Sequence, residues 1–163
     1  MPKFRKYGTD RRMDALVDSE DWVDRRTAAE QRYGLEKLIN DEDFDVRREV
    51  AIQGYGLDRL VNDKGKYVRS AVAKHNYGLD ILINDKDPYV RDAVARQGYG
   101  LDILVSDKNA CVRQAVAVQG YCLDVLINDK EWFVRAAVAR HGYGLNILIK
   151  DKDKDVRDEV TDY

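Results

Sequence analysis

One sequence pattern recurs every 22 residues along almost the whole chain, and it restricts the possible folds more than any other feature. Residues 53–64 read QGYGLDRLVNDK, and residues 75–86 read HNYGLDILINDK. A fixed period of this length is typical of repeat architectures, in which each unit packs only against its neighbours. We therefore predict a single repeat domain over residues 9–163, preceded by a short basic lead at residues 1–8. Its seven repeats begin at residues 9, 31, 53, 75, 97, 119 and 141.

Apolar residues recur at helical spacing in two parts of each repeat, whose positions we number from 1 to 22. Position 8 is leucine in all seven repeats, and positions 5, 8 and 9 form one stripe at i, i+3 and i+4. Positions 16, 19 and 20, such as Val90, Ala93 and Val94, form a second stripe with the same spacing. Asp87 before Pro88 fits a helix N-cap, and the glycine common at position 2 fits a left-handed helix end. Each repeat is thus predicted to contain two short helices.

Neither helix of a repeat is long enough to be stable alone in water, because isolated helices below about 12 residues are marginal. Strands are disfavoured, since no segment alternates between apolar and polar residues with a period of two. Each apolar stripe must therefore be buried against the next repeat. The sequence predicts an all-α fold, an α-solenoid of seven two-helix repeats.

The repeat motif also carries a family resemblance. Residues 85–95 follow the pattern Asp, four variable residues, Val-Arg, two variable residues and Val-Ala, which resembles the leucine-rich repeat variant and related HEAT-like repeats. This resemblance covers nearly the whole chain and implies an α-helix and a shorter 3₁₀-like helix per repeat, stacked into a right-handed superhelix. One member of that family carries an iron–sulfur cluster on a cysteine-rich leader. Residues 1–8 contain no cysteine, so we do not expect that cofactor here.

Composition and charge exclude several classes of protein. The 28 lysines and arginines nearly balance 30 aspartates and glutamates, and a net charge of −2 argues against a generally basic nucleic-acid binder. No apolar run approaches the ~18 residues of a membrane span, and no apolar stretch typical of a secretory signal follows Met1. With only two cysteines in the chain, we expect a cytoplasmic protein without membrane contact.

Two polar rows recur almost without exception, and each has two interpretations. Arginine stands at position 17 of every repeat and aspartate at position 11 of six, which indicates either phosphate-binding arginines or an internal Arg–Asp ladder. Tyrosine at position 3 of six repeats indicates either rings that stack on nucleic-acid bases or rings that pack internally. In the second case each hydroxyl is expected to bond a neighbouring backbone group. Because both rows are so regular, we favour the internal roles.

Residues able to hold a metal ion or to perform catalysis are dispersed along the chain. His75 and His141 are three repeats apart, roughly 30 Å at the usual spacing of packed helices. Cys111 and Cys122 have no further ligand at metal-binding spacing. Glutamine or histidine at position 1 is instead expected to bind carbonyl groups at the end of the second helix. Since the chain also lacks a glycine-rich phosphate loop and a nucleophile with suitable partners, we predict no metal, no cofactor and no enzymatic activity.

Positions 14, 15, 18 and 22 lie outside the apolar stripe of the second helix and vary between repeats. Several carry aromatic residues or arginine, which are favoured at binding hot spots. We predict a non-enzymatic scaffold that binds another protein or a peptide at this surface. The alternatives are a HEAT-like basic surface that binds a nucleic-acid backbone, and a structural or self-associating element. The candidate contact residues are Lys66, Tyr67, Tyr89, Arg96, Trp132, Phe133 and Arg140.

Leu104 occupies position 8 of the fifth repeat and is expected to be almost fully buried. Replacing it by alanine should lower the free energy of unfolding by roughly 2–5 kcal/mol, because the substitution leaves a cavity in the core. The loss should extend to the neighbouring repeats, which depend on each other for burial. Thermal unfolding followed by circular dichroism measures this effect, and an unchanged midpoint for Leu104→Ala would contradict the assignment of the stripe.

Overall fold

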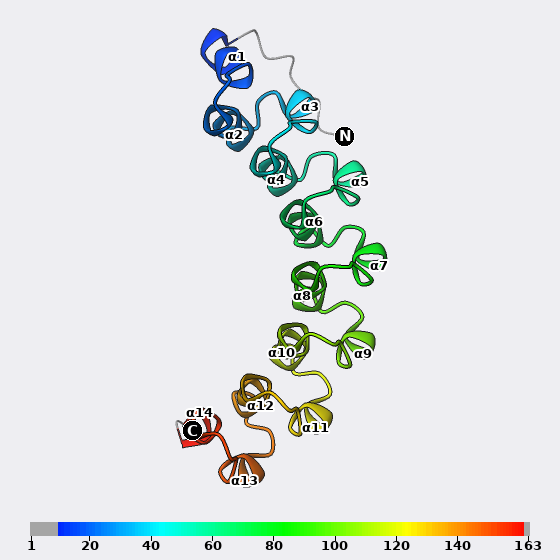
Figure 1. The fold of residues 1–163 in the computed structure, drawn as a ribbon, viewed down its shortest axis with the longest axis vertical. Helices are drawn as coiled ribbons and strands as arrows, with labels where there is room; N and C mark the ends of the chain where they lie inside the picture. The colour runs from blue at the N-terminus through cyan, green and yellow to red at the C-terminus, as the bar shows by residue number, and fades with distance from the viewer. Residues whose placement is uncertain (1–9, 162–163) are drawn as a thin grey trace. The chain divides into compact units, whose positions relative to one another are not determined.

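The computed structural model describes residues 10–161, which contain fourteen helices and no strand (Figure 1). The predicted basic lead at residues 1–8 lies outside these residues. The chain forms two compact units, of which the first ends at Tyr77 and the second begins at Gly78. The N-terminal unit contains α1 (Arg11–Val17), α2 (Trp22–Glu30), α3 (Leu35–Leu38), α4 (Phe44–Ile52), α5 (Leu57–Leu60) and α6 (Lys66–Ala73). The C-terminal unit contains α7 (Leu79–Leu82), α8 (Pro88–Arg96), α9 (Leu101–Leu104), α10 (Ala110–Val118), α11 (Leu123–Leu126), α12 (Trp132–Ala139), α13 (Leu145–Leu148) and α14 (Lys154–Thr161).

Within each unit, long and short helices alternate along the chain and form two rows (Figure 1). The long helices pack on one another in chain order, α2 on α4 and α4 on α6 in the first unit, and α8 through α14 in the second. Each short helix contacts the long helix that follows it. The stacking of successive two-helix repeats confirms the predicted all-α solenoid. The right-handed superhelix implied by the family resemblance stays a prediction.

The core follows the two predicted stripes. Position 8 leucines from Leu38 to Leu148 are only 1–3% exposed, with Leu104 at 2%. Val90 and Val94 of the second stripe are fully buried. The first stripe is less regular at position 9, where Ile149 of the last repeat is 40% exposed. Each position 8 leucine is thus buried in the core, which explains why a four-residue helix such as α9 is stable here.

The end of each long helix is set by backbone conformation at positions 1 to 3. Gly54 adopts a left-handed φ of 74°, and its amide donates to the carbonyl of Ala51. The amide of Tyr55 then donates to the carbonyl of Val50, which completes a Schellman-type ending. Asn76 takes the same conformation with a φ of 56°, as the sequence predicts for a residue that replaces this glycine.

A second left-handed residue, at position 4, starts each short helix and packs against the preceding repeat. Gly100 has a φ of 60°, and a Cβ added there would lie 2.1 Å from Cδ1 of Ile83. Gly56 and Gly144 face isoleucine in the same way. Cys122 occupies this position with a φ of 49°, and the residue in the place of Ile83 is then Val105, which has no Cδ1. Valine at position 9 is not confined to this junction, because Val17 lies opposite Gly34.

Gly100→Ala should lower the free energy of unfolding by roughly 2–4 kcal/mol, because it adds left-handed strain and a clash with Ile83. Combining it with Ile83→Val should recover part of this loss, although Ile83→Val alone costs about 0.5–1.5 kcal/mol. Denaturant unfolding of the two single variants and the double variant measures the coupling. Strictly additive losses would show that the glycine is not needed for this contact.

Candidate functional site

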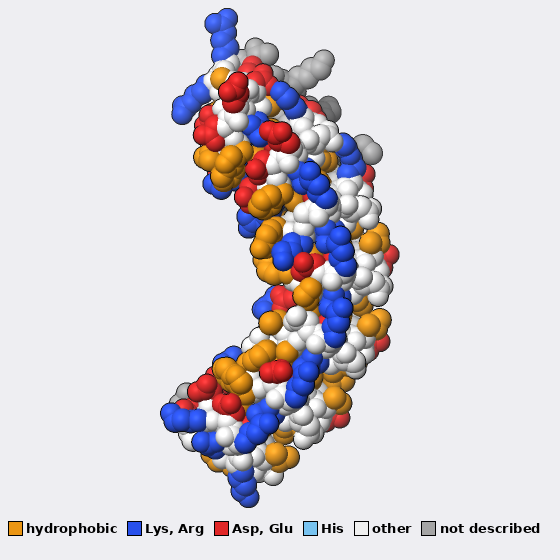
Figure 2. Space-filling model, in the orientation of Figure 1, with side chains coloured by type: hydrophobic (Ala, Val, Ile, Leu, Met, Phe, Trp, Pro, Cys, Tyr) orange, Lys and Arg blue, Asp and Glu red, His pale blue; other side chains and the backbone are white. Residues whose placement is uncertain are grey.

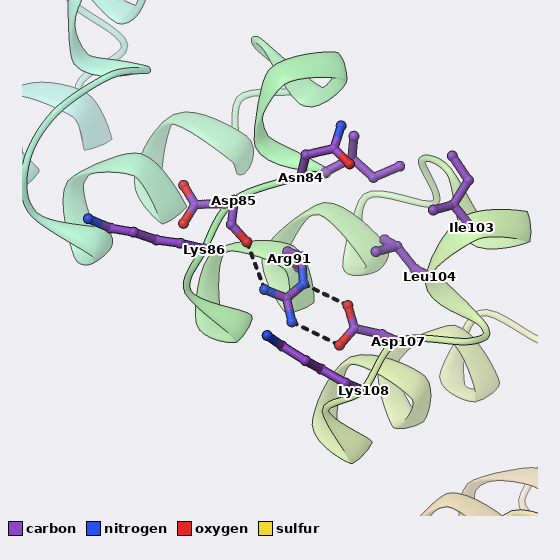
Figure 3. A pocket seen from close by; sticks show the side chains of 9 residues that line it. Asn84, Asp85, Lys86, Arg91, Ile103, Leu104, Asp107 and Lys108 are labelled. Atoms are coloured by element: carbon purple, nitrogen blue, oxygen red, sulfur yellow. Dashed lines mark hydrogen bonds and ion pairs between the residues drawn. The ribbon is translucent and has the colours of Figure 1, made fainter.

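Arginines at position 17 bind aspartates of the following repeat rather than pointing into solvent, whereas Arg157 of the last repeat donates to the backbone carbonyl of Asp151. Arg91 Nε donates to Asp107 Oδ2 at 2.6 Å, and its Nη2 donates to Oδ1 at 2.9 Å (Figure 3). Its Nη1 donates to the backbone carbonyl of Asp85 at 2.7 Å. The predicted internal Arg–Asp ladder is confirmed, and these arginines are not available to phosphates. The same bidentate pairing joins Arg25 to Asp41, Arg47 to Asp63, Arg113 to Asp129 and Arg135 to Asp151.

In the Arg91–Asp107 pair, electrostatics favour the charged forms despite burial. Burial alone would raise the pKa of Asp107, but hydrogen bonds from Arg91 and from the Asn109 amide outweigh it and hold that pKa below its ordinary value of 3.8. The pKa of Arg91 is raised, chiefly by its hydrogen bond to Asp107. The Asn109 amide donates to Asp107 Oδ1 at 2.8 Å, so the same carboxylate also shapes the turn that leads into α10.

The tyrosines at position 3 depart from the prediction. Tyr33 Oη donates to the Asp14 carboxylate at 2.6 Å. The hydroxyls of Tyr99 and Tyr143 make no hydrogen bond within residues 10–161, and these side chains are 41% and 42% exposed. The expected bond from each hydroxyl to the backbone is therefore wrong. The backbone amide closes the helix end instead, as Tyr55 shows.

Position 1 follows the prediction in part. His75 Nε2 lies 3.0 Å from the carbonyl oxygen of Ile52, and Gln119 Nε2 donates to that of Arg96, but Gln53 Nε2 donates to the Glu49 carboxylate. The two carbonyls belong to α4 and α8, whereas His75 follows α6 and Gln119 follows α10, so each contact links neighbouring long helices. Among the described residues, no group of three or more His, Cys, Asp or Glu side chains is arranged to hold a metal ion. Of the two cysteines, which form no disulfide, Cys111 is exposed.

The seven candidate contact residues are divided between the two units. Lys66 and Tyr67 begin α6 in the N-terminal unit, and the other five belong to the C-terminal unit. Trp132 and Phe133 begin α12, where their rings meet edge to face with centroids 5.8 Å apart. Tyr89 lies at the corresponding end of α8 and is 45% exposed.

The two candidate arginines lie at the other end of the long helices. Arg96 ends α8 and Arg140 follows α12, so about seven residues, or roughly 10 Å of helix, separate each from the aromatic residues. Arg96 Nε donates to Asp92 at 2.8 Å, and Arg140 pairs with Glu159. Within the C-terminal unit, the aromatic candidates thus lie at one end of the long helices and the arginines at the other.

Exposed aromatic residues at positions 14 and 15 form what we call the aromatic edge of each unit. In the N-terminal unit, Phe44 and Tyr67 are in ring contact with centroids 6.0 Å apart, and the Lys66 ammonium lies 5.4 Å from the Tyr67 ring centroid. Trp22 also belongs to this edge and carries Arg26 above its ring at 5.6 Å. The prediction centred on repeats 3 to 6 and left out Trp22 and Phe44, although both stand at position 14. The edge residues Trp22, Phe44, Tyr67, Tyr89 and Trp132 are 38–45% exposed.

A row of lysines at position 12 was missed by sequence reasoning. We call it the lysine row; its C-terminal-unit members are Lys86, Lys108, Lys130 and Lys152. All four are exposed, and none has an ion pair within the described part of the chain. Basic side chains are numerous on the face drawn in Figure 2, and Lys86 and Lys108 flank the Arg91–Asp107 pair in Figure 3. These two lysines line a shallow groove of about 410 Å³ together with Asn84 and Ile103. The lysine row could have been found from the sequence, because its members are 22 residues apart, like the arginines at position 17.

An aliphatic row at position 7 was also missed. It consists of Ile81, Ile103, Val125 and Ile147, which lie on α7, α9, α11 and α13. These side chains are 52–59% exposed, more than the other large hydrophobic residues of the described chain. In the earlier repeats the same position holds Lys37 or Arg59, so the row belongs to the C-terminal unit alone.

Comparison of the sequence with models of known protein families and with curated protein sequences gave no match. The resemblance to the leucine-rich repeat variant and HEAT-like repeats is thus carried by the repeat motif. Among residues 10–161, no helix is both long enough and apolar enough to cross a membrane.

Asp107→Asn should lower the free energy of unfolding by roughly 3 kcal/mol at neutral pH, because it leaves the buried Arg91 charge without a counter-charge. The folded-state pKa of Asp107 lies below the ordinary value of 3.8, so its stabilising effect is complete above that pH and is lost as the pH falls through the folded-state pKa. The difference between wild type and variant should therefore be largest near pH 7 and shrink below about pH 4.

Denaturant unfolding at several pH values measures this difference. The exposed Asp102 offers a matched control, since Asp102→Asn should change stability little at any of them. A wild-type advantage over Asp107→Asn that persists unchanged at about pH 2 would contradict the proposed charge pairing.

Proposed function

We propose that this chain is a non-enzymatic α-solenoid scaffold that binds a protein partner along its aromatic edge. The observation that carries the proposal is the exposure of Trp132, Tyr89 and Tyr67, which are 41–45% exposed at positions that the fold does not dictate. Ala110 and Cys111 occupy positions 14 and 15 of the repeat between Tyr89 and Trp132. Since small residues serve there, the core does not require large rings at these sites.

The local contacts of the aromatic edge favour a binding role. Trp132 packs edge to face on Phe133, and the Arg26 guanidinium lies over Trp22. Such contacts restrict the rings before a partner arrives and so reduce the entropy lost on binding. Tryptophan and tyrosine also provide large contact areas with few rotatable bonds, which is why they predominate at interface hot spots.

The ionisable side chains support a scaffold rather than an enzyme. The buried arginines, such as Arg91 and Arg113, are engaged in pairs that link neighbouring repeats. Every buried side-chain nitrogen or oxygen among residues 10–161 has a hydrogen-bond partner, as expected of side chains that hold the stack together. The unpaired cysteines agree with the reducing cytoplasm that we propose as its location.

Binding of a nucleic-acid backbone is the second candidate function, and the lysine row is the observation that favours it. Because the position 17 arginines are engaged within the protein, phosphate contacts would fall to these lysines. Such binding weakens steeply with salt, whereas association anchored by aromatic residues does not. The salt dependence of binding therefore separates the two functions.

Truncating both anchors in Tyr89→Ala/Trp132→Ala should abolish capture of the protein partner from extracts of the source cells. The helical circular-dichroism signal and the melting temperature should stay nearly unchanged, because both residues are surface-exposed. Quantitative mass spectrometry of proteins retained by immobilised wild type and variant measures the loss.

Tyr99→Ala/Tyr143→Ala is the matched control, since these rings are 41% and 42% exposed on a different edge of the same unit. It should retain the partner. Equal retention by both double variants, or loss that accompanies unfolding, would argue against the aromatic edge as the binding surface.

A further inference from the structure

The lysine row and the aromatic edge of the C-terminal unit lie at the same end of the long helices. Position 12 precedes positions 14 and 15 by two or three residues, and α8 and α12 begin at position 14. Lys86 is thus close in sequence to Tyr89, and Lys130 to Trp132. A ligand bound along the aromatic edge therefore passes the lysine row in each repeat.

Most other basic side chains near these helices are already paired. Arg91 and Arg113 bind aspartates of the next repeat, and Arg96 binds Asp92 within its own helix. In contrast, Lys86 and Lys108 have no carboxylate partner among the described residues. These exposed ammonium groups are the cations that this edge offers to an outside anion.

The repeat sets the spacing of the lysine row. Each repeat that begins in the C-terminal unit has one lysine at position 12, and packed helices such as α8, α10 and α12 are typically about 8–10 Å apart. An extended peptide in the polyproline II conformation has three residues per turn and advances about 3.1 Å per residue, so every third side chain returns to the same face after about 9 Å. Carboxylates at every third residue of an extended segment therefore match successive lysines.

The surrounding charges favour a peptide over a nucleic acid. Residues 78–163 carry 12 lysines and arginines against 15 aspartates and glutamates, a formal charge of −3. Position 13, between the lysine row and the aromatic edge, holds Asp87, Glu131 and Asp153. A nucleic acid brings a charged phosphate at every nucleotide and meets these carboxylates, whereas a peptide can place neutral groups opposite them. The aromatic residues also occur in only some repeats, which suits an irregular ligand.

We infer that the partner segment of the C-terminal unit is an extended acidic peptide. Its carboxylates pair with the lysine row, and its apolar side chains pack on Tyr89, Trp132 and Phe133. This inference rests on the proposed scaffold function and specifies the chemistry of the partner at the same edge.

An array of synthetic peptides tests this spacing directly. The peptides share one composition of glutamate, leucine and glycine and differ only in whether glutamate stands at every second, third or fourth residue. Fluorescence anisotropy with the full chain should show the tightest binding for the every-third pattern. Replacing glutamate by glutamine should remove that preference, and an oligothymidine of equal length should bind more weakly than the best peptide.

Substitution of the lysine row provides the second arm. Lys86→Gln/Lys108→Gln should weaken binding of the every-third peptide about fivefold or more. Lys37→Gln/Lys74→Gln removes the same charge from outside the row and should leave the affinity nearly unchanged. Equal effects of the two double variants, or no spacing preference, would overturn the inference, as would tighter lysine-dependent binding of oligothymidine.

The scaffold function itself is judged separately by the Tyr89→Ala/Trp132→Ala capture experiment. If that variant loses a protein partner while the acidic peptides do not bind, the proposed function stands and the inferred peptide chemistry is wrong. If the variant loses no partner, the proposed function fails whatever the peptides do.

Discussion

The bidentate pair between arginine at position 17 and aspartate at position 11 is the interaction on which the rest of the structure depends. Each guanidinium binds the carboxylate of the next repeat and a backbone carbonyl of its own, so it fixes one turn against another. The side chains of Arg91 and Asp107 are only 8% and 7% exposed. Because removing one partner of such a pair leaves a buried charge, both residues must recur together. The carboxylate also accepts the amide of Asn109, so one side chain sets the interface and the start of α10.

The positions used by the core and by the Arg–Asp ladder determine which residues remain available for binding a partner. Positions 8, 16 and 20 are used by the core, and positions 11 and 17 by the ladder between repeats. The cap constrains the backbone at the start of a long helix, as in α8, where Asp87 accepts a hydrogen bond from the Tyr89 amide. It does not constrain which side chains point outward from the first turn. Aromatic residues can therefore vary there without disturbing the stack. The lysine row lies beside them because position 12 directly follows the ladder aspartate in sequence.

The period and the apolar spacing were sufficient to predict the helices, the leucine core and the Arg–Asp ladder. They did not predict the exposed lysine row at position 12 or the exposed aliphatic row at position 7, because we took a residue type that recurs in every repeat to be buried. In the later repeats, lysine at the position of Lys108 and an aliphatic residue at the position of Ile103 recur as regularly as arginine at the position of Arg91. Both Lys108 and Ile103 are nevertheless exposed. The separation of Arg96 from Tyr89 follows from the length of α8, which the sequence indicated only approximately. The boundary between Tyr77 and Gly78 has no counterpart in the sequence, since the repeat continues across it.

The contact between position 9 of one repeat and position 4 of the next has a consequence for how such an array grows. Ile83 accepts only glycine opposite it, as at Gly100, whereas the side chain of Cys122 stands opposite the shorter Val105. A duplication that copied residues 119–140 alone would place a second cysteine opposite Ile127 and crowd the new junction. A duplication whose break falls inside a repeat, and which carries Val105 together with Cys122, avoids this crowding. For the repeat that contains Cys122, the unit that can be copied without a clash therefore starts inside one repeat and ends inside the next.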